Sequence, residues 1–346
     1  MQVQLEKARA AANFTRYRGE KTGGHYESYF MRANDAATGH AFWIRYTVFQ
    51  PDSGAASKKQ AMGELWAIYF EKGKAPVAAK SEFAISKAQY SNTNFDLNFD
   101  GATLNFNSLK GSANNCGENK IEWDLKINPI KTSKDGNALF PMPLSTYDAP
   151  LPRAKLLVPQ PFVTFSGHLQ VNGKKISIGD WQGSQNHNWG SRHTDEYAWG
   201  QVAGFDNEPD TFLEVASAKL KFGPVMTPYI TPIVLRHKGQ EFALNTYWQA
   251  FRNSAEVKYF DWSFAGENAD FKVSGRIFAE RGDFVALSYY NPPGDVKTCL
   301  NSKIAGCELN LTEKSRIGLR LNLKTANRAA FEILTSKTDH GFSPMF

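Results

Sequence analysis

The residues His40–Phe49 read HAFWIRYTVF, a run of aromatic and β-branched side chains that is typical of a β-strand. A second such run, GELWAIYF, covers Gly63–Phe70, and the turn-forming residues Pro51–Ser57 lie between the two. Together they predict two strands joined by a loop. Farther along, Phe95–Phe106 alternates apolar and polar residues around Asp100-Gly101, which predicts a hairpin with a primed turn.

Strand patterns of this kind continue through the rest of the chain. Helical patterns are confined to Gln4–Ala12 and the segment between Cys299 and Cys307. Many short strands separated by turns indicate an all-β chain with sandwich or barrel architecture. Prolines gather between Asn128 and Pro161 and interrupt the pattern. This interruption predicts two domains, residues 1–150 and 151–346.

The composition limits the classes of partner. The chain has 346 residues, a net charge of +6 and 21% charged residues, and its Lys and Arg residues are scattered. We therefore expect no nucleic-acid partner. No apolar run is long enough to span a membrane, so we expect no transmembrane helix. The charged start Met1–Phe14 does not read as a secretory signal, which favours the cytoplasm, or the periplasm if a signal was trimmed.

A glycine-bounded motif at the centre of the chain, Gly183–Gly190, reads GSQNHNWG. In extended backbone, His187 and Trp189 project to the same face, which puts a titratable ring beside an apolar wall. The alternative is a tight turn whose polar side chains satisfy backbone groups while Trp189 fills the core. The glycines allow either positive φ or a close approach of another segment.

Two strands expected after this motif carry further candidates. Trp199 and Tyr197 share one face of the first strand, and Glu214 is a lone carboxylate in the largely apolar second strand. If Glu214 faces the interior, loss of solvent raises its pKa and makes it a proton donor; if it faces water, it is an ordinary surface charge. We expect one cavity to be lined by His187, Glu214, Trp189 and Trp199, with Asn186 and Asn188 contacting substrate and Trp181, Tyr197 and Phe212 as outer wall.

The sequence predicts neither a metal nor an organic cofactor. The histidines lack carboxylate or thiol companions at ligand spacing, and phosphate-cradling loops and hydrolase motifs are absent. Cys299 and Cys307 are separated by a short segment and are expected to lie close in space, either as a disulfide or as two thiols.

The motif residues Trp181–Gly183 and Asn186–Gly190, followed by Trp199, resemble the carotenoid 1,2-hydratase family. Relatives of this family include attachment-protein-like bacterial proteins, tocopherol cyclases and fungal lipocalin-like Diels–Alderases. The N-terminal half resembles the attachment-protein-like branch at Tyr26–Tyr29, Ala41–Tyr46 and Gly63–Ala67. The resemblance implies two lipocalin-like β-barrel or sandwich domains packed together, with a ligand cleft between or within them.

The resemblance also implies site residues. In the carotenoid hydratases of the family, the His and Trp of the motif line the site, and a downstream Tyr-x-Asp supplies a carboxyl proton donor. Here the motif residues correspond to His187 and Trp189, and the downstream pair to Phe212 and Glu214. The carboxyl group is kept and the phenol is lost. This departure argues against hydration of a carotenoid and leaves acid-assisted chemistry on another apolar substrate open.

Three functions compete at this point. The first is a cofactor-independent hydratase, cyclase or isomerase of a hydrophobic isoprenoid- or polyketide-like substrate, with Glu214 or His187 as the acid and aromatic rings stabilising positive charge. The second is a lipocalin-like carrier of a hydrophobic small molecule without catalytic activity, with His187 as a structural clamp. The third is a structural or attachment role. Fold analogy alone does not choose among them.

Overall fold

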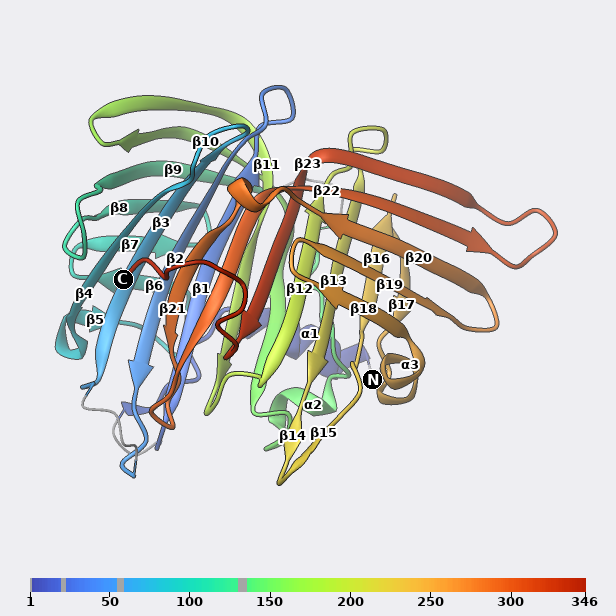
Figure 1. The fold of residues 1–346 in the computed structure, drawn as a ribbon, viewed down its shortest axis with the longest axis horizontal. Coiled ribbons are helices and arrows are strands. Elements are labelled where there is room, and N and C mark those ends of the chain that lie inside the picture. Colours follow the sequence, from blue (N-terminus) through green and yellow to red (C-terminus); the bar gives the residue numbers. More distant parts are fainter. Residues whose placement is uncertain (1, 20–22, 55–58, 130–135) are drawn as a thin grey trace.

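The computed structural model describes residues 2–19, 23–54, 59–129 and 136–346. They form an almost entirely β protein, and the expectation of two lipocalin-like β domains is confirmed. Figure 1 shows two large sheets side by side, with short helices at their ends. Among the described residues, no helix is long and apolar enough to cross a membrane. The helices are α1 (Gln2–Ala10), α2 (Ser145–Asp148), α3 (Tyr247–Arg252) and the 3-10 turns η2 (Ile85–Lys87) and η3 (Arg281–Asp283).

The first sheet has eleven antiparallel strands in the described residues and curls into a nearly closed barrel. The backbone oxygen of Lys80 accepts hydrogen bonds from the amides of Asn115 (3.1 Å) and Cys116 (3.0 Å), which joins one edge of the sheet to a far loop. In spatial order the strands are β4 (Val77–Ala84), β3 (Met62–Glu71), β2 (His40–Gln50), β1 (His25–Asn34), β11 (Lys174–Gly190), β10 (Ala154–Val171), β9 (Ile121–Pro129), β8 (Ser108–Ala113), β7 (Ala102–Asn105), β6 (Asp96–Phe99) and β5 (Ala88–Gln89).

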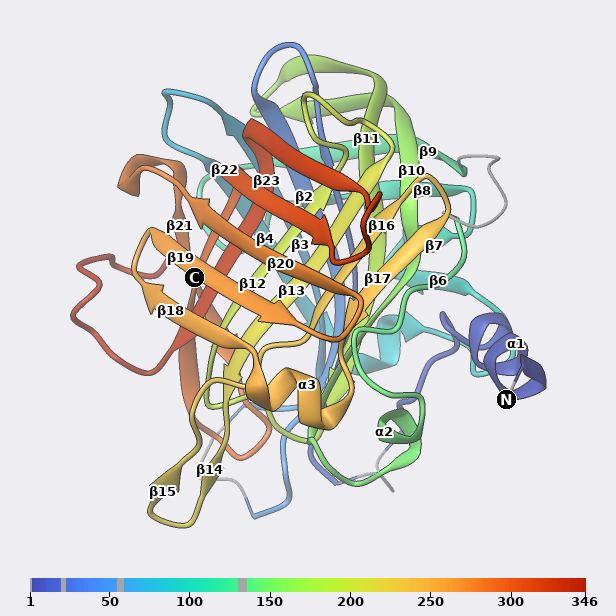
Figure 2. The same ribbon diagram turned by 90° about the vertical axis from the view of Figure 1, so that its right-hand side faces the viewer.

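The second sheet follows in the chain and has ten strands in the part that the structure describes. A two-stranded hairpin of β14 (Lys221–Phe222) and β15 (Val225–Met226) projects near α3 at the lower end of the molecule in Figure 2. The strand order is β17 (Gln240–Leu244), β16 (Ile233–His237), β13 (Thr211–Lys219), β12 (Glu196–Ala203), β23 (Arg320–Thr335), β22 (Val296–Glu313), β20 (Phe271–Phe278), β19 (Asp261–Glu267) and β18 (Ser254–Lys258), and β21 (Val285–Tyr290) pairs with β22.

The chain changes from the first sheet to the second after Gly190. The proline-rich segment leads from β9 to β10, which are neighbours in the first sheet. The boundary that the sequence predicts at residue 150 therefore does not coincide with the change of sheet, because β10 and β11 continue the first barrel. The division into separately folding domains stays a prediction.

The two sheets pack face to face where β22 crosses β1, β2 and β3. Strands at this contact are buried on both faces, as the unbroken burial of β1 shows. Alternate residues point to opposite faces. In β2, Phe42 and Ile44 enter the barrel core, whereas Trp43 faces the second sheet with Phe30 of β1 and Trp199 of β12. We call this shared zone the intersheet layer.

The glycine motif is a continuous part of β11 rather than a tight turn. A Cβ atom at Gly183 would lie 1.9 Å from the backbone oxygen of Arg32, and one at Gly190 would lie 2.1 Å from that of Arg153. Both glycines are therefore required by the close approach of a neighbouring strand, one of the two reasons that the sequence suggested. The alternative of a turn is wrong.

The prediction for the cysteines is also wrong. Cys299 and Cys307 lie in one extended strand, β22, and pair with Leu334 and Thr325 of β23 respectively. Both thiols are free. Eight residues at about 3.3 Å per residue separate the two by roughly 26 Å, far beyond the reach of a disulfide. The segment between them is neither a loop nor a helix.

Candidate functional site

The predicted site residues lie on opposite faces of β11. The ring of His187 stacks on Tyr29 with centroids 4.2 Å apart and lies 4.7 Å from the ring of Trp189, both on the barrel side. Asn186 projects to the intersheet layer, where its side chain bonds to Gln201 of β12. The four residues expected around one cavity are therefore separated by the backbone of the first sheet, with His187 and Trp189 on one side and Trp199 and Glu214 on the other.

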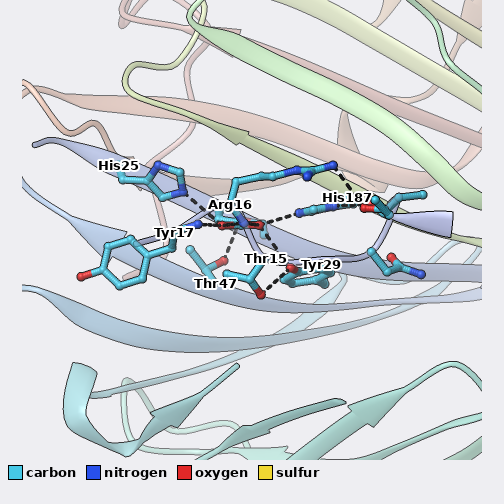
Figure 3. Close-up of polar contacts among 12 residues, drawn as sticks. Thr15, Arg16, Tyr17, His25, Tyr29, Thr47 and His187 are labelled. Carbon is cyan, nitrogen blue, oxygen red and sulfur yellow. Dashed lines mark hydrogen bonds and ion pairs between the residues drawn. The ribbon is translucent and has the colours of Figure 1, made fainter. Parts of the chain in front are cut away.

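On the barrel side, the buried carboxylate of Glu27 is the centre of a polar cluster. Figure 3 labels the residues that donate to it, which are Arg16, Tyr17, His25, Tyr29 and His187. Burial opposes its charge, but hydrogen bonds from His187 and His25 outweigh this effect and hold the pKa of Glu27 well below its usual range. Its donors are the backbone amides of Arg16 (2.8 and 3.0 Å) and Tyr17 (2.7 Å), the rings of His187 (2.8 Å) and His25 (3.1 Å), and the hydroxyl of Tyr29 (3.1 Å).

His187 uses both of its ring nitrogens in this cluster. Nδ1 lies 2.7 Å from the backbone oxygen of Ala12, and Nε2 lies 2.8 Å from Oε1 of Glu27. A carbonyl and a carboxylate only accept hydrogen bonds, so both ring nitrogens of His187 face acceptors. These two contacts fasten the segment after α1 to the barrel. In this geometry both ring nitrogens of His187 are occupied by protein groups.

In the intersheet layer, Glu214 of β13 is 1% exposed. Its Oε1 accepts a hydrogen bond of 2.6 Å from Nε1 of Trp199, and its Oε2 accepts one of 2.8 Å from Nε2 of Gln201. Burial raises the pKa of Glu214 to about 8, because the loss of solvent outweighs these two hydrogen bonds and the nearby charge of Arg32. At neutral pH this side chain is a protonated acid.

A chain of amides fixes the orientation of this acid. Gln201 donates a second hydrogen bond of 2.7 Å to Oδ1 of Asn186, and its own Oε1 accepts one of 2.6 Å from the hydroxyl of Ser184. Asn186 in turn donates to Ser184 over 2.9 Å. The glycine motif therefore does reach Glu214, through Ser184 and Asn186 rather than through His187.

The remaining predicted residues are divided between the intersheet layer and the barrel core. Tyr197 is half-buried and packs in the intersheet layer. Asn188, on the same face of β11 as Asn186, keeps its Oδ1 buried without a hydrogen-bond partner in the described residues. Trp181 stacks on Phe42 in the barrel core, with ring centroids 6.1 Å apart. Phe212 packs against Phe162 of β10 at 5.6 Å. Trp181 is therefore outside the neighbourhood of Glu214, and Phe212 packs at its margin.

Several charged residues of the intersheet layer were missed by sequence reasoning. Lys303 of β22 is fully buried and donates to Glu332 of β23 over 2.8 Å. Arg32 of β1 and Arg45 of β2 are buried on the opposite sheet. The signal for the two arginines is a single charge between apolar neighbours, as in Met31-Arg32-Ala33 and Ile44-Arg45-Tyr46. Glu27, at the centre of the barrel cluster, lies inside the stretch Tyr26–Tyr29. The local sequence pattern did not indicate a functional role for it.

Two surface depressions in the described part of the chain lie away from Glu27 and from Glu214. One lies along β7, β8 and β9 and includes Lys110, Asp124 and His168; the other lies at the barrel end near Tyr69 and Val171. Neither is lined by His187 or Glu214. Within the described residues, no group of three or more His, Cys, Asp or Glu side chains is arranged to hold a metal ion.

Comparison with known proteins identifies relatives of this architecture. The model of the tocopherol cyclase-like family matches residues 23–334. The crystal structure of an AttH protein from Nitrosomonas europaea aligns with a TM-score of 0.52 and 10% identity over 92% of this chain and 95% of its own. The crystal structure of CghA aligns with a TM-score of 0.50 and 9% identity over 91% and 89%. None of the curated proteins matches the chain.

Proposed function

Because this chain belongs to the tocopherol cyclase-like family, we propose that it is a cofactor-independent cyclase, isomerase or hydratase that acts on a hydrophobic substrate by acid catalysis. The observation that carries the proposal is Glu214. A carboxyl group that is 1% exposed, with a pKa of about 8, keeps its proton at neutral pH and can give it to a substrate.

The proposed reaction starts with transfer of the Glu214 proton to an alkene carbon or a carbonyl oxygen. When an internal double bond closes a ring, the positive charge moves to a new carbon. The charge is removed when a hydroxyl or a water molecule adds and loses a proton, or when a neighbouring carbon loses a proton. The proton released in the last step returns to the Glu214 carboxylate, so the enzyme is regenerated. Trp199, Trp43 and Phe30 offer π faces that stabilise the cation.

The surroundings of Glu214 suit this role. The indole N–H of Trp199 and the amide of Gln201 hold its two oxygens, so the acid is pre-oriented at little entropic cost. The same two donors stabilise the carboxylate left after proton transfer. Tocopherol cyclases are by their name ring-forming enzymes, which agrees with the cyclisation branch of the proposal. An isoprenoid- or polyketide-like body is the substrate class that we favour.

The alternative function is a lipocalin-like carrier of a hydrophobic small molecule without catalytic activity. The hydrogen bonds of His187 favour the carrier function. Both of its ring nitrogens are occupied by protein groups, so one of the two candidate acids would serve as a structural clamp. Conversion of substrate distinguishes the two functions. Purified protein incubated with a panel of prenylated phenols, polyprenyl alcohols and linear polyenes gives new products by chromatography and mass spectrometry if it is an enzyme, and unchanged recovery of a bound compound if it is a carrier.

For any substrate that is converted, we expect a rate that is constant near neutral pH and falls above about pH 8. The sign follows from the protonated form being active: above its pKa, the fraction of protonated Glu214 falls about tenfold per pH unit. A steady-state pH–rate profile of kcat checks this. A rate that rises through the same pH range would indicate a general base and contradict the proposal.

A further inference from the structure

Arg32 is a fully buried cation that is only partly satisfied. Its Nη2 donates to Oδ1 of Asn34 over 2.7 Å and to the backbone oxygen of Arg328 over 2.5 Å. Its Nε and Nη1 have no hydrogen-bond partner among the described residues. Buried polar groups are almost always paired, and an unpaired guanidinium N–H is costly. The orphaned atoms therefore call for an acceptor that the chain itself does not provide.

The neighbours of Arg32 share this property. Trp43 lies directly opposite Arg32 in the pairing of β1 with β2, and Arg45 lies directly opposite Trp66 in the pairing of β2 with β3. Within the described ranges, Nε1 of Trp43, Nε of Arg45 and Nε1 of Trp66 also lack hydrogen-bond partners. All four side chains face the second sheet. We call Arg32, Trp43, Arg45 and Trp66 the donor patch.

The acidic side chains of the facing sheet are engaged elsewhere. Glu214 accepts from Trp199 and Gln201, and Oε1 of Glu332 accepts from Lys303 (2.8 Å) and Asn301 (3.0 Å). Burial and the neighbouring Arg328 lower the pKa of Arg32 to about 9, so Arg32 remains positively charged at neutral pH. The intersheet layer thus holds unpaired N–H groups of Arg32 and Arg45 beside two large indole rings. The ammonium groups of Lys303 and Lys80 lie over these rings, 5.6 Å from the centroid of Trp43 and 4.3 Å from that of Trp66.

We propose that the donor patch binds the anionic oxygen head group of a hydrophobic organic acid, with the apolar body of that molecule against the indoles of Trp43 and Trp66. The inference rests on the proposed function and deepens it by naming the substrate class. Carboxylate oxygens match the donors of a guanidinium, and an apolar body matches the ring faces. Arg32 also lies close enough to Glu214 to influence the pKa of its carboxyl group, so a head group held by Arg32 lies near the acid. Binding requires the facing side chains of the two sheets to separate.

The test compares two probes of equal chain length, dodecanoate and dodecanol, by isothermal titration calorimetry at neutral pH. The intact wild-type chain is expected to bind dodecanoate at least tenfold more tightly than dodecanol, and Arg32→Met is expected to abolish this preference while leaving dodecanol binding unchanged. Arg236→Met is the matched control. Arg236 is a buried arginine of β16 outside the donor patch, it donates to Glu241 over 2.7 Å, and its loss leaves the preference intact.

Equal binding of the two probes by the wild type, or no binding of dodecanoate, overturns the proposal without any variant. If Arg32→Met does not fold, Arg32→Lys keeps the charge and is expected to keep the preference with reduced affinity. Glu214→Gln separates this inference from the proposed function. If Glu214→Gln abolishes turnover but dodecanoate does not bind, only the anion site is wrong. If dodecanoate binds through Arg32 and Glu214→Gln is fully active, only the acid is wrong.

Discussion

Glu214→Gln is expected to lower kcat by about 10²–10⁴-fold, the range that a positioned general acid contributes. The amide has the shape of the carboxyl group and keeps an oxygen to accept from Trp199, but it has no acidic proton to give. Substrate affinity is expected to stay within a few-fold of the wild type because the aromatic walls are unchanged. Single-turnover kinetics together with equilibrium binding separate the two effects.

The matched control for this variant is Glu256→Gln. Glu256 lies on β18 of the same sheet with a side chain that is 66% exposed. The substitution Glu256→Gln is therefore expected to leave kcat unchanged. Full activity of Glu214→Gln would remove Glu214 as the acid. Since both nitrogens of His187 are occupied, such a result would favour the carrier function over a change of catalytic residue.

Glu27→Gln is expected to lower the free energy of unfolding by about 3–5 kcal/mol, the cost of breaking a buried ion pair from one side. The amide keeps the volume but turns an NH₂ group toward donors and leaves His187 without the carboxylate that it pairs with. Urea denaturation at neutral pH measures the change. Glu6→Gln, which alters an exposed pair with Arg9, is the control and is expected to change stability by less than about 1 kcal/mol.

The stabilisation by Glu27 depends on pH in a defined direction. The pKa of Glu27 in the folded protein lies below its ordinary value of 4.5, so its contribution is present above about pH 4.5 and is lost as the pH falls toward the folded-state pKa. The difference between wild type and Glu27→Gln should therefore shrink in acid. A variant with wild-type stability and abolished turnover would assign the cluster to catalysis instead of structure.

Local pattern was sufficient to predict the contact between Trp199 and Glu214. The two residues lie on consecutive strands, and the observed register puts Glu214 opposite Gln201 and diagonal to Trp199. Inward side chains of a hairpin meet in this way whatever the rest of the fold. The burial of Glu214 depended on the first sheet lying over its strand, which alternation alone left undecided.

The assignment of His187 to the same site failed because successive side chains of a β-strand point to opposite faces of the sheet. The motif leads directly into β12, so proximity in sequence suggested one cavity. Because side chains alternate, the residues of the motif that face Glu214 are Ser184 and Asn186, which lie on the opposite face of β11 from His187.

The contact of His187 with Glu27 could not be predicted from the local sequence. Glu27 is 160 residues away in sequence, and the two meet because β1 pairs with β11 in a register that sets Tyr29 opposite His187. Pairing of strands so distant is fixed by the closure of the barrel, and no short motif encodes it. The donor patch was hidden similarly, since Arg32 and Trp43 become neighbours only through the register of β1 with β2.

The most direct test of the account is the protonation state of Glu214 in the resting protein. Difference infrared spectroscopy of wild type against Glu214→Gln isolates the C=O stretch of this one carboxyl group across a pH titration. We expect a protonated carboxyl band at neutral pH that is absent in the variant and disappears with a midpoint of about 8. A carboxylate that is already ionised at about pH 6, as an ordinary glutamate is, would contradict the acid mechanism.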